Sequence, residues 1–176
     1  MLVLVVGPSG AGKDTLLDGA RAALPNARFV RRFITRPAEA GGEDHVPVSE
    51  VEFAQRAFAL RWRAHGLCYG IPADIVGDLA RGGVVIVNVS RGVVAEAASR
   101  FPAHVIEVTA PPELLAARLS ARGRETAADV ASRLARSVAL PDGVPVTRVM
   151  NDGSVDDGVA RFVAAVTRLT EAARRS

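Results

Sequence analysis

The run Leu2-Val3-Leu4-Val5-Val6 is followed directly by Gly7-Pro8-Ser9-Gly10-Ala11-Gly12-Lys13, and this stretch decides the fold. The apolar run is typical of a buried strand, and the loop after it matches the pattern G-x-x-x-x-G-K. In such a loop, backbone N–H groups surround phosphate oxygens and the lysine reaches the β- and γ-phosphates. A plain glycine-rich turn is the alternative. The required order of strand, loop and helix, with a helical pattern at Lys13–Leu24, favours the phosphate-binding loop.

Three further apolar, β-branched runs are expected to be strands, at Val84–Val89, His104–Thr109 and Val146–Met150. Helical patterns alternate with the strands, at Pro72–Ala80, Val93–Ser99, Pro112–Ala121, Ala127–Ala139 and Val155–Ala173. Near-continuous apolar strands alternating with helices predict a three-layer α/β fold around a central parallel sheet.

One segment interrupts this alternation, from residue 28 to about 72. It holds a short extended stretch, a polar glycine-rich turn at Glu39–Asp44 and one short helix near Ser49–Phe58. Ser49 followed by Glu52 forms a capping box that predicts where this helix starts. We therefore interpret the chain as a single domain, with a core of residues 1–27 and 73–176 and an insert of about 28–72.

Composition excludes several classes of protein. The 176 residues are 49% hydrophobic, which is enough for a core and argues against disorder. No apolar stretch approaches the roughly 18 residues of a membrane helix, and the short run at the N-terminus does not match a signal peptide. Cys68 is the only cysteine, so a disulfide framework is excluded and a cytoplasmic location is expected. The three histidines have no metal-ligand spacing.

The charge pattern favours small anionic ligands. Of the 22 basic residues, Lys13 is the only lysine, and it lies in the glycine loop. The arginines are scattered along the chain without a basic run or interleaved aromatic residues, so nucleic-acid binding is not expected.

The chain resembles the guanylate-kinase branch of the nucleoside-monophosphate kinases over nearly its full length. The matching residues are Gly7–Lys13, Thr35-Arg36-Pro37, Trp62, Tyr69-Gly70, Pro111-Pro112, Arg118-Leu119, Arg122-Gly123, Arg133-Leu134 and Asn151-Asp152. The resemblance implies a P-loop NTPase fold with a small acceptor-binding insert and an arginine-bearing lid at about residues 118–133.

Departures from this pattern lie where the family recognises guanine. Arg32 replaces a hydroxyl residue, Arg61 a glutamate, Ile71 a serine or threonine, and Asn88 an aspartate. Carboxylates that accept hydrogen bonds from guanine have become a cation and an amide, which would leave buried donors of the base unpaired. Guanylate kinase activity is therefore not expected.

The same departures resemble a narrower group, the ribose 1,5-bisphosphate phosphokinases of phosphonate breakdown. The other shared features are Gly-Lys-Asp-Thr at 12–15, Trp62, His65-Gly66, Tyr69-Gly70, Arg32–Arg36 and Arg118…Arg122–Glu125. The resemblance implies ATP-dependent phosphorylation of a sugar bisphosphate on its 1-phosphate, giving 5-phosphoribosyl 1-diphosphate and ADP. Two phosphates on the acceptor would explain the added arginines, because guanidinium groups match phosphate geometry.

Roles for individual residues follow from the resemblance. Lys13, Arg122 and Arg133 are expected to be catalytic. The residues expected to bind ATP are Gly7, Pro8, Ser9, Gly10, Ala11, Gly12, Lys13, Asp14, Thr15, Arg118 and Arg122. Those expected to bind the acceptor are Arg32, Arg36, Arg61, Tyr69 and Asn88. For the lid arginines, an exposed basic stripe paired with neighbouring acids is the simpler alternative.

Asp14 stands where the loop pattern has a serine or threonine that contacts Mg²⁺. Because Asn88 supplies no carboxylate at the end of its strand, we expect Asp14 to contact the Mg²⁺ that accompanies ATP, directly or through water. The alternative is an acid that stabilises the first turn of the helix through the helix dipole.

Two other functions stay open at this stage. One is a nucleoside-monophosphate kinase with an altered base preference, and the other is a catalytically inactive guanylate-kinase-like binding module. Retention of the glycine loop and Lys13 argues against the inactive module. The sequence leaves the oligomeric state undefined.

Overall fold

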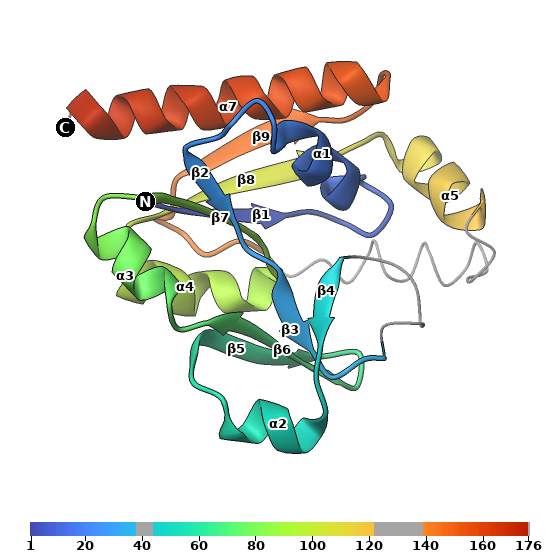
Figure 1. Ribbon diagram of the computed structural model, residues 1–176. Coiled ribbons are helices and arrows are strands. Elements are labelled where there is room, and N and C mark those ends of the chain that lie inside the picture. The colour runs from blue at the N-terminus through green and yellow to red at the C-terminus, as the bar shows by residue number, and fades with distance from the viewer. Residues whose placement is uncertain (38–43, 122–138, 176) are drawn as a thin grey trace.

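The computed structural model describes residues 1–37, 44–121 and 139–175 (Figure 1). Its centre is a five-stranded sheet with the order β2-β7-β1-β8-β9. All neighbouring strands are parallel. The strands are β1 (Leu2–Val6), β2 (Ala27–Phe29), β7 (Val84–Asn88), β8 (Ala103–Thr109) and β9 (Val146–Met150). Every residue of β1 is buried, as its place in the middle of the sheet requires.

Helices cover both faces of the central sheet. On one face lie α1 (Lys13–Ala20) and α7 (Val155–Arg175), and on the other α3 (Ile75–Ala80) and α4 (Val94–Arg100), the last preceded by a short 3₁₀ turn at Arg91–Val93 (Figure 1). Helix α5 (Pro112–Ala121) stands beside the sheet, after β8. Alternate residues of β1 enter two apolar clusters, one on each face. The predicted three-layer α/β fold is confirmed.

A second sheet lies below the first, with the order β4-β3-β6-β5. Its strands are β3 (Arg32–Ile34), β4 (His45–Pro47), β5 (Phe58–Ala64) and β6 (Leu67–Pro72), and α2 (Glu50–Gln55) accompanies them. Leu60 and Ile71 point to the cluster beneath the central sheet, so we call this the inner face. The outer face carries Phe33 and Phe58, which pack with Phe53 of α2.

The strands of this second sheet differ from the sequence-based expectation of an extended stretch and one helix. The missed signal is the pair His65-Gly66, whose φ angles of 51° and 75° are both positive. Two such residues form the kind of tight turn that joins antiparallel strands, and the run Leu60-Arg61-Trp62-Arg63 before it alternates between apolar and polar residues. The short helix was correctly expected, and the capping box of Ser49 and Glu52 is present.

Several element boundaries also differ. Strand β2 pairs with β7, so the central sheet extends to Phe29 and the second sheet begins at Arg32 rather than near residue 28. Helix α3 starts at Ile75 because β6 continues to Pro72, and α1 ends at Ala20 rather than Leu24. The division into core, insert and lid stays a prediction.

The predicted turn at Glu39–Asp44 and the predicted helix Ala127–Ala139 lie almost wholly outside the described residues, as does most of the expected lid. Among the helices that the structure describes, none combines the length and the apolar character needed to cross a membrane.

Phe162 on α7 is fully buried between that helix and the sheet. We expect Phe162→Ala to lower the free energy of unfolding by about 4 kcal/mol, because a large buried side chain is lost and a cavity remains. Urea denaturation measures this change. Thr167→Ala, an exposed position on the same helix, is the matched control and should change stability by less than about 0.5 kcal/mol. Equal losses in both variants would contradict the packing of α7.

Candidate active site

The glycine loop runs from the end of β1 to the start of α1, and its glycines are required by close contacts. A Cβ atom on Gly7 would lie 2.1 Å from the carbonyl oxygen of Val108, and one on Gly12, where φ is +84°, would lie 2.5 Å from Nδ2 of Asn151. The Lys13 ammonium donates to the carbonyl oxygens of Gly7 and Pro8 at 2.9 and 3.0 Å. The lysine is therefore curled over the loop, where a bound phosphate chain would meet it.

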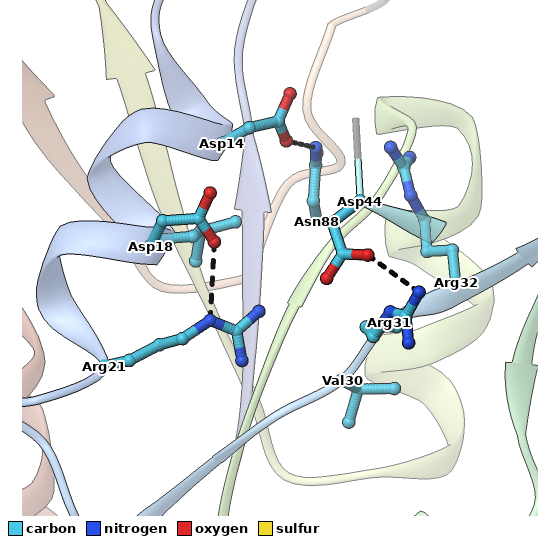
Figure 2. A pocket seen from close by; sticks show the side chains of 9 residues that line it. Asp14, Asp18, Arg21, Val30, Arg31, Arg32, Asp44 and Asn88 are labelled. Carbon is cyan, nitrogen blue, oxygen red and sulfur yellow. Dashed lines mark hydrogen bonds and ion pairs between the residues drawn. The ribbon is translucent and has the colours of Figure 1, made fainter. Parts of the chain in front are cut away.

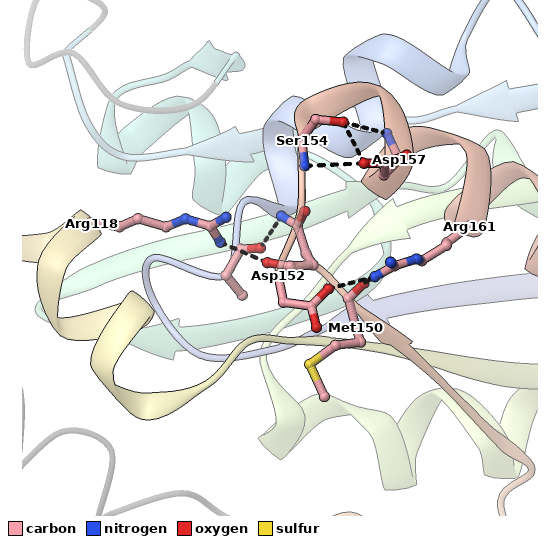
Figure 3. Close-up of polar contacts among 8 residues, drawn as sticks. Arg118, Met150, Asp152, Ser154, Asp157 and Arg161 are labelled. Atoms are coloured by element: carbon pink, nitrogen blue, oxygen red, sulfur yellow. Dashed lines mark hydrogen bonds and ion pairs between the residues drawn. The ribbon is translucent and has the colours of Figure 1, made fainter.

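Asn151 supports this loop from beneath, a role that local sequence patterns do not reveal. Its side chain is buried and donates from Nδ2 to the carbonyl oxygen of Ala11 at 2.8 Å. The backbone carbonyl oxygen of Asn151 accepts a hydrogen bond of 3.1 Å from Nη1 of Arg118 on α5 (Figure 3). The helix that follows is capped by Ser154, whose hydroxyl accepts from the backbone N–H of Asp157.

Asp14 and Asn88 meet at the carboxyl ends of the strands. Asn88, buried at the end of β7, donates from Nδ2 to Oδ1 of Asp14 at 3.0 Å (Figure 2). The loop carboxylate therefore lies beside the strand position at which the sequence lacks one. A single carboxylate fits Mg²⁺ bound with ATP, because this ion takes one or two carboxylates and completes its shell with phosphates and water. Thr15, the neighbouring hydroxyl, is exposed.

Arg32 faces this pair from the second sheet. Its guanidinium lies over the Tyr69 ring, 5.5 Å from the ring centroid, and borders the same small pocket as Asp14 and Asn88. Burial, together with the like charge of Arg36, lowers the pKa of Arg32 to about 10, against the opposing effects of Asp14 and Tyr69. At neutral pH, Arg32 therefore stays a cation, held in partly dry surroundings.

Arg36 follows shortly after the end of β3 at Ile34. With Thr35, Ser49 and Glu52 it lines a hollow of about 430 Å³. The His45 ring shares a hydrogen bond of 3.1 Å between its Nε2 and the carbonyl oxygen of Arg36. The like charge of Arg36 acts on Arg32, so the two guanidinium groups lie within electrostatic range of each other. A pair of cations suits an acceptor that carries more than one negative charge.

The strand register does not place Arg61 on the face that carries Arg32 and Tyr69. In the antiparallel register Arg61 pairs with Gly70, whereas Trp62 pairs with Tyr69. Side chains directly opposite one another share a face, so Arg61 points to the outer face and is exposed there, away from Tyr69 and Arg32 on the inner face. The acceptor-binding role expected of Arg61 stays a prediction, and the register places Arg61 on the face opposite that of Tyr69.

The lid residues Arg122 and Arg133 lie outside the described residues. Arg118 is described, and its guanidinium contacts the carbonyl oxygen of Asn151 behind the glycine loop. Within the described ranges no three His, Cys, Asp or Glu side chains gather as a metal-binding cluster. The structure thus brings together Lys13, Asp14, Asn88, Arg32 and Tyr69, with Arg36 close by.

Known ribose 1,5-bisphosphate phosphokinases match this chain over nearly its full length. The chain is 55% identical over 170 residues to the ribose 1,5-bisphosphate phosphokinase PhnN of Acidiphilium cryptum. The aligned region covers 95% of this chain and 92% of that protein. The chain belongs to the ribose 1,5-bisphosphate phosphokinase family. It is also 46% identical to the PhnN enzyme of Burkholderia pseudomallei, with 96% of both chains covered.

Another relative shows this family unit inside a longer protein. The bifunctional ribose 1,5-bisphosphokinase–thymidine phosphorylase of Cupriavidus pinatubonensis is 53% identical over 171 residues, which span 93% of this chain and 28% of that protein. No protein-family model matches the chain.

Among solved structures, the fold is shared with guanylate kinase from Anaplasma phagocytophilum, at a TM-score of 0.68 and 15% identity, covering 97% of this chain and 86% of that one. A gluconokinase from Sinorhizobium meliloti matches with a TM-score of 0.58 and 18% identity over 98% of this chain and 94% of that one. These two likenesses show that this chain has the P-loop kinase fold.

Asn151→Ala tests the support of the glycine loop. The substitution leaves the buried carbonyl oxygen of Ala11 without its donor, so we expect about 1–3 kcal/mol less free energy of unfolding and weaker ATP binding. Urea denaturation and calorimetric titration with ATP measure both effects. Asp152→Ala, which removes an exposed ion pair with Arg161, is the neighbouring control and should change ATP binding little. Unchanged ATP affinity in Asn151→Ala would rule out the supporting role.

Proposed function

We propose that this protein transfers the γ-phosphoryl group of ATP to the 1-phosphate of ribose 1,5-bisphosphate, giving 5-phosphoribosyl 1-diphosphate and ADP. Identity of 55% to a named ribose 1,5-bisphosphate phosphokinase over nearly the whole of both chains carries this proposal. The resemblance to guanylate kinases supports it, because Arg32 and Asn88 stand at sequence positions where that family is expected to recognise a base. The retained loop and Lys13 favour an active enzyme over an inactive binding module.

In this reaction the protein mainly positions the two substrates and neutralises the charge of their phosphates. An oxygen of the acceptor's 1-phosphate attacks the γ-phosphorus of ATP, a P–O bond forms, and the bond to ADP breaks. The attacking oxygen is already ionised near neutral pH, so no general base is needed. The loop N–H groups and Lys13 hold the ATP phosphates, and Arg36 and Tyr69 hold the attacking phosphate. Arg122 and Arg133 stay proposed as the lid cations that neutralise charge in the transition state.

Mg²⁺ bound with ATP would neutralise charge on the β- and γ-phosphates. We propose Asp14 as the residue that contacts this ion or its waters, with Asn88 fixing the orientation of the carboxylate by the hydrogen bond of 3.0 Å. We further propose that the enzyme acts in the cytoplasm, where ATP is available and Cys68 stays reduced, and that it serves phosphonate breakdown as its family resemblance implies.

A coupled assay of ADP release tests the function. Ribose 1,5-bisphosphate should be phosphorylated faster than GMP or AMP, and the product should be 5-phosphoribosyl 1-diphosphate by mass. Lys13→Ala should lose more than about 100-fold in rate, equivalent to about 2.7 kcal/mol of barrier, because its ammonium neutralises phosphate charge. Faster turnover of a nucleoside monophosphate would replace the proposal with the nucleotide kinase. Turnover of Lys13→Ala within tenfold of wild type would contradict the role of the loop lysine.

Arg32 and Arg61 should differ as acceptor-binding residues. We expect Arg32→Ala to lower kcat/KM for ribose 1,5-bisphosphate by roughly 10–100-fold, the loss of one charged hydrogen-bonding partner, with KM for ATP nearly unchanged. Arg61→Ala, on the outer face of the same sheet, should stay within about twofold of wild type. Steady-state kinetics with each substrate varied in turn measure both. A large acceptor effect in Arg61→Ala would place that residue in the site after all.

Asp14→Ser tests the metal contact. The variant restores the usual hydroxyl but removes the charge, so we expect a higher Mg²⁺ concentration for half-maximal rate at saturating ATP. KM for the acceptor should change far less. Asp18→Asn, one turn later on α1 and paired only loosely with Arg21, is the matched control and should leave the Mg²⁺ curve in place. Superimposable curves for Asp14→Ser and wild type would reduce Asp14 to an acid that stabilises the helix dipole.

A further inference from the structure

The sole tryptophan and the sole tyrosine of the chain lie against each other beside Arg32. The rings of Trp62 on β5 and Tyr69 on β6 are stacked, with centroids 5.3 Å apart and an angle of 9° between their planes. The guanidinium of Arg32 lies over the Tyr69 ring at 5.5 Å. Strand register places all three side chains on the inner face of the second sheet. They form a stack of two rings and one cation.

This stack limits where the Arg32 guanidinium can go. A planar guanidinium gains attraction from the face of an aromatic ring, and the gain is larger where water is excluded. Tyr69 is itself only 8% exposed, so it is a fixed surface rather than a mobile one. Because burial also lowers the pKa of Arg32, the cation occupies a position that favours an incoming anion.

Trp62 differs from the other inner-face residues of its strand. Leu60 and its partner Ile71 are fully buried in the apolar cluster, whereas Trp62 is only partly buried at the rim of that cluster. The Trp62 ring instead stacks on Tyr69, whose ring in turn lies beside the Arg32 guanidinium.

We propose that Trp62 is a positioning residue for acceptor specificity: by stacking on Tyr69 it fixes the Arg32 guanidinium where the second phosphate of the acceptor binds. This inference rests on the proposed function. It also accounts for discrimination against nucleotides, because Trp62 and Arg32 already occupy the stacking surface of Tyr69. A nucleobase entering this region would find a cation in place of a free ring face.

A double-mutant cycle between Trp62 and Arg32 tests the proposal. We expect Trp62→Met, which fills space without a ring, to raise KM for ribose 1,5-bisphosphate about tenfold, with kcat and KM for ATP changed less than twofold. In an Arg32→Ala background, Trp62→Met should have no further effect on that KM, because the residue acts through Arg32. Trp62→Phe keeps a ring and should recover most of the wild-type KM. Trp62→Leu is run in parallel as a second ringless variant.

Phe58→Leu is the matched control for general damage to the sheet. It removes a ring from the outer face, and it should lower the melting temperature without changing KM for the acceptor relative to KM for ATP. If the wild type is active and the effects of Trp62→Met and Arg32→Ala on KM for the acceptor multiply, the positioning role of Trp62 is overturned. The proposed function is then unaffected. Absence of turnover of ribose 1,5-bisphosphate by wild type would instead overturn the proposed function.

Discussion

The contact between the glycine loop and its surroundings constrains the rest of the site. Gly7 lies against the carbonyl oxygen of Val108, and Gly12 against the side chain of Asn151, so neither position has room for a Cβ atom. Strand β8, the turn after β9 and helix α5 therefore meet at one short loop. This arrangement fixes the direction in which the loop N–H groups point, and with it the place of the phosphate chain. Everything that binds the acceptor must be positioned relative to that point.

The second sheet carries the residues proposed to bind the acceptor, and its two faces have different roles. The outer face packs aromatic rings against α2, and Gly70 is needed there because a Cβ atom would lie 2.5 Å from the Phe58 ring. The inner face continues the apolar cluster of the central sheet and carries Arg32 toward Asp14 and Asn88. A side chain's role in this region is thus decided by the face it occupies.

Much of this architecture could be predicted from the sequence, because its signals are local. The apolar run and glycine loop predicted the first strand and helix, and three more central strands followed from continuous apolar stretches. The face that Arg61 occupies could not be predicted, because a shift of one residue in register moves a side chain to the opposite face, and only the hairpin through His65-Gly66 defines that register. Asn151 was missed as a support for the loop because its partner Ala11 is 140 residues away in the chain.

The stack of Trp62 on Tyr69 also has an optical consequence. These are the only residues of their kinds in the chain, so all of its indole and phenol absorption arises within one corner of the second sheet. Near-ultraviolet circular dichroism and intrinsic fluorescence therefore report on the acceptor end of the site rather than on the molecule as a whole. The protein carries its own spectroscopic label where its substrate is proposed to bind.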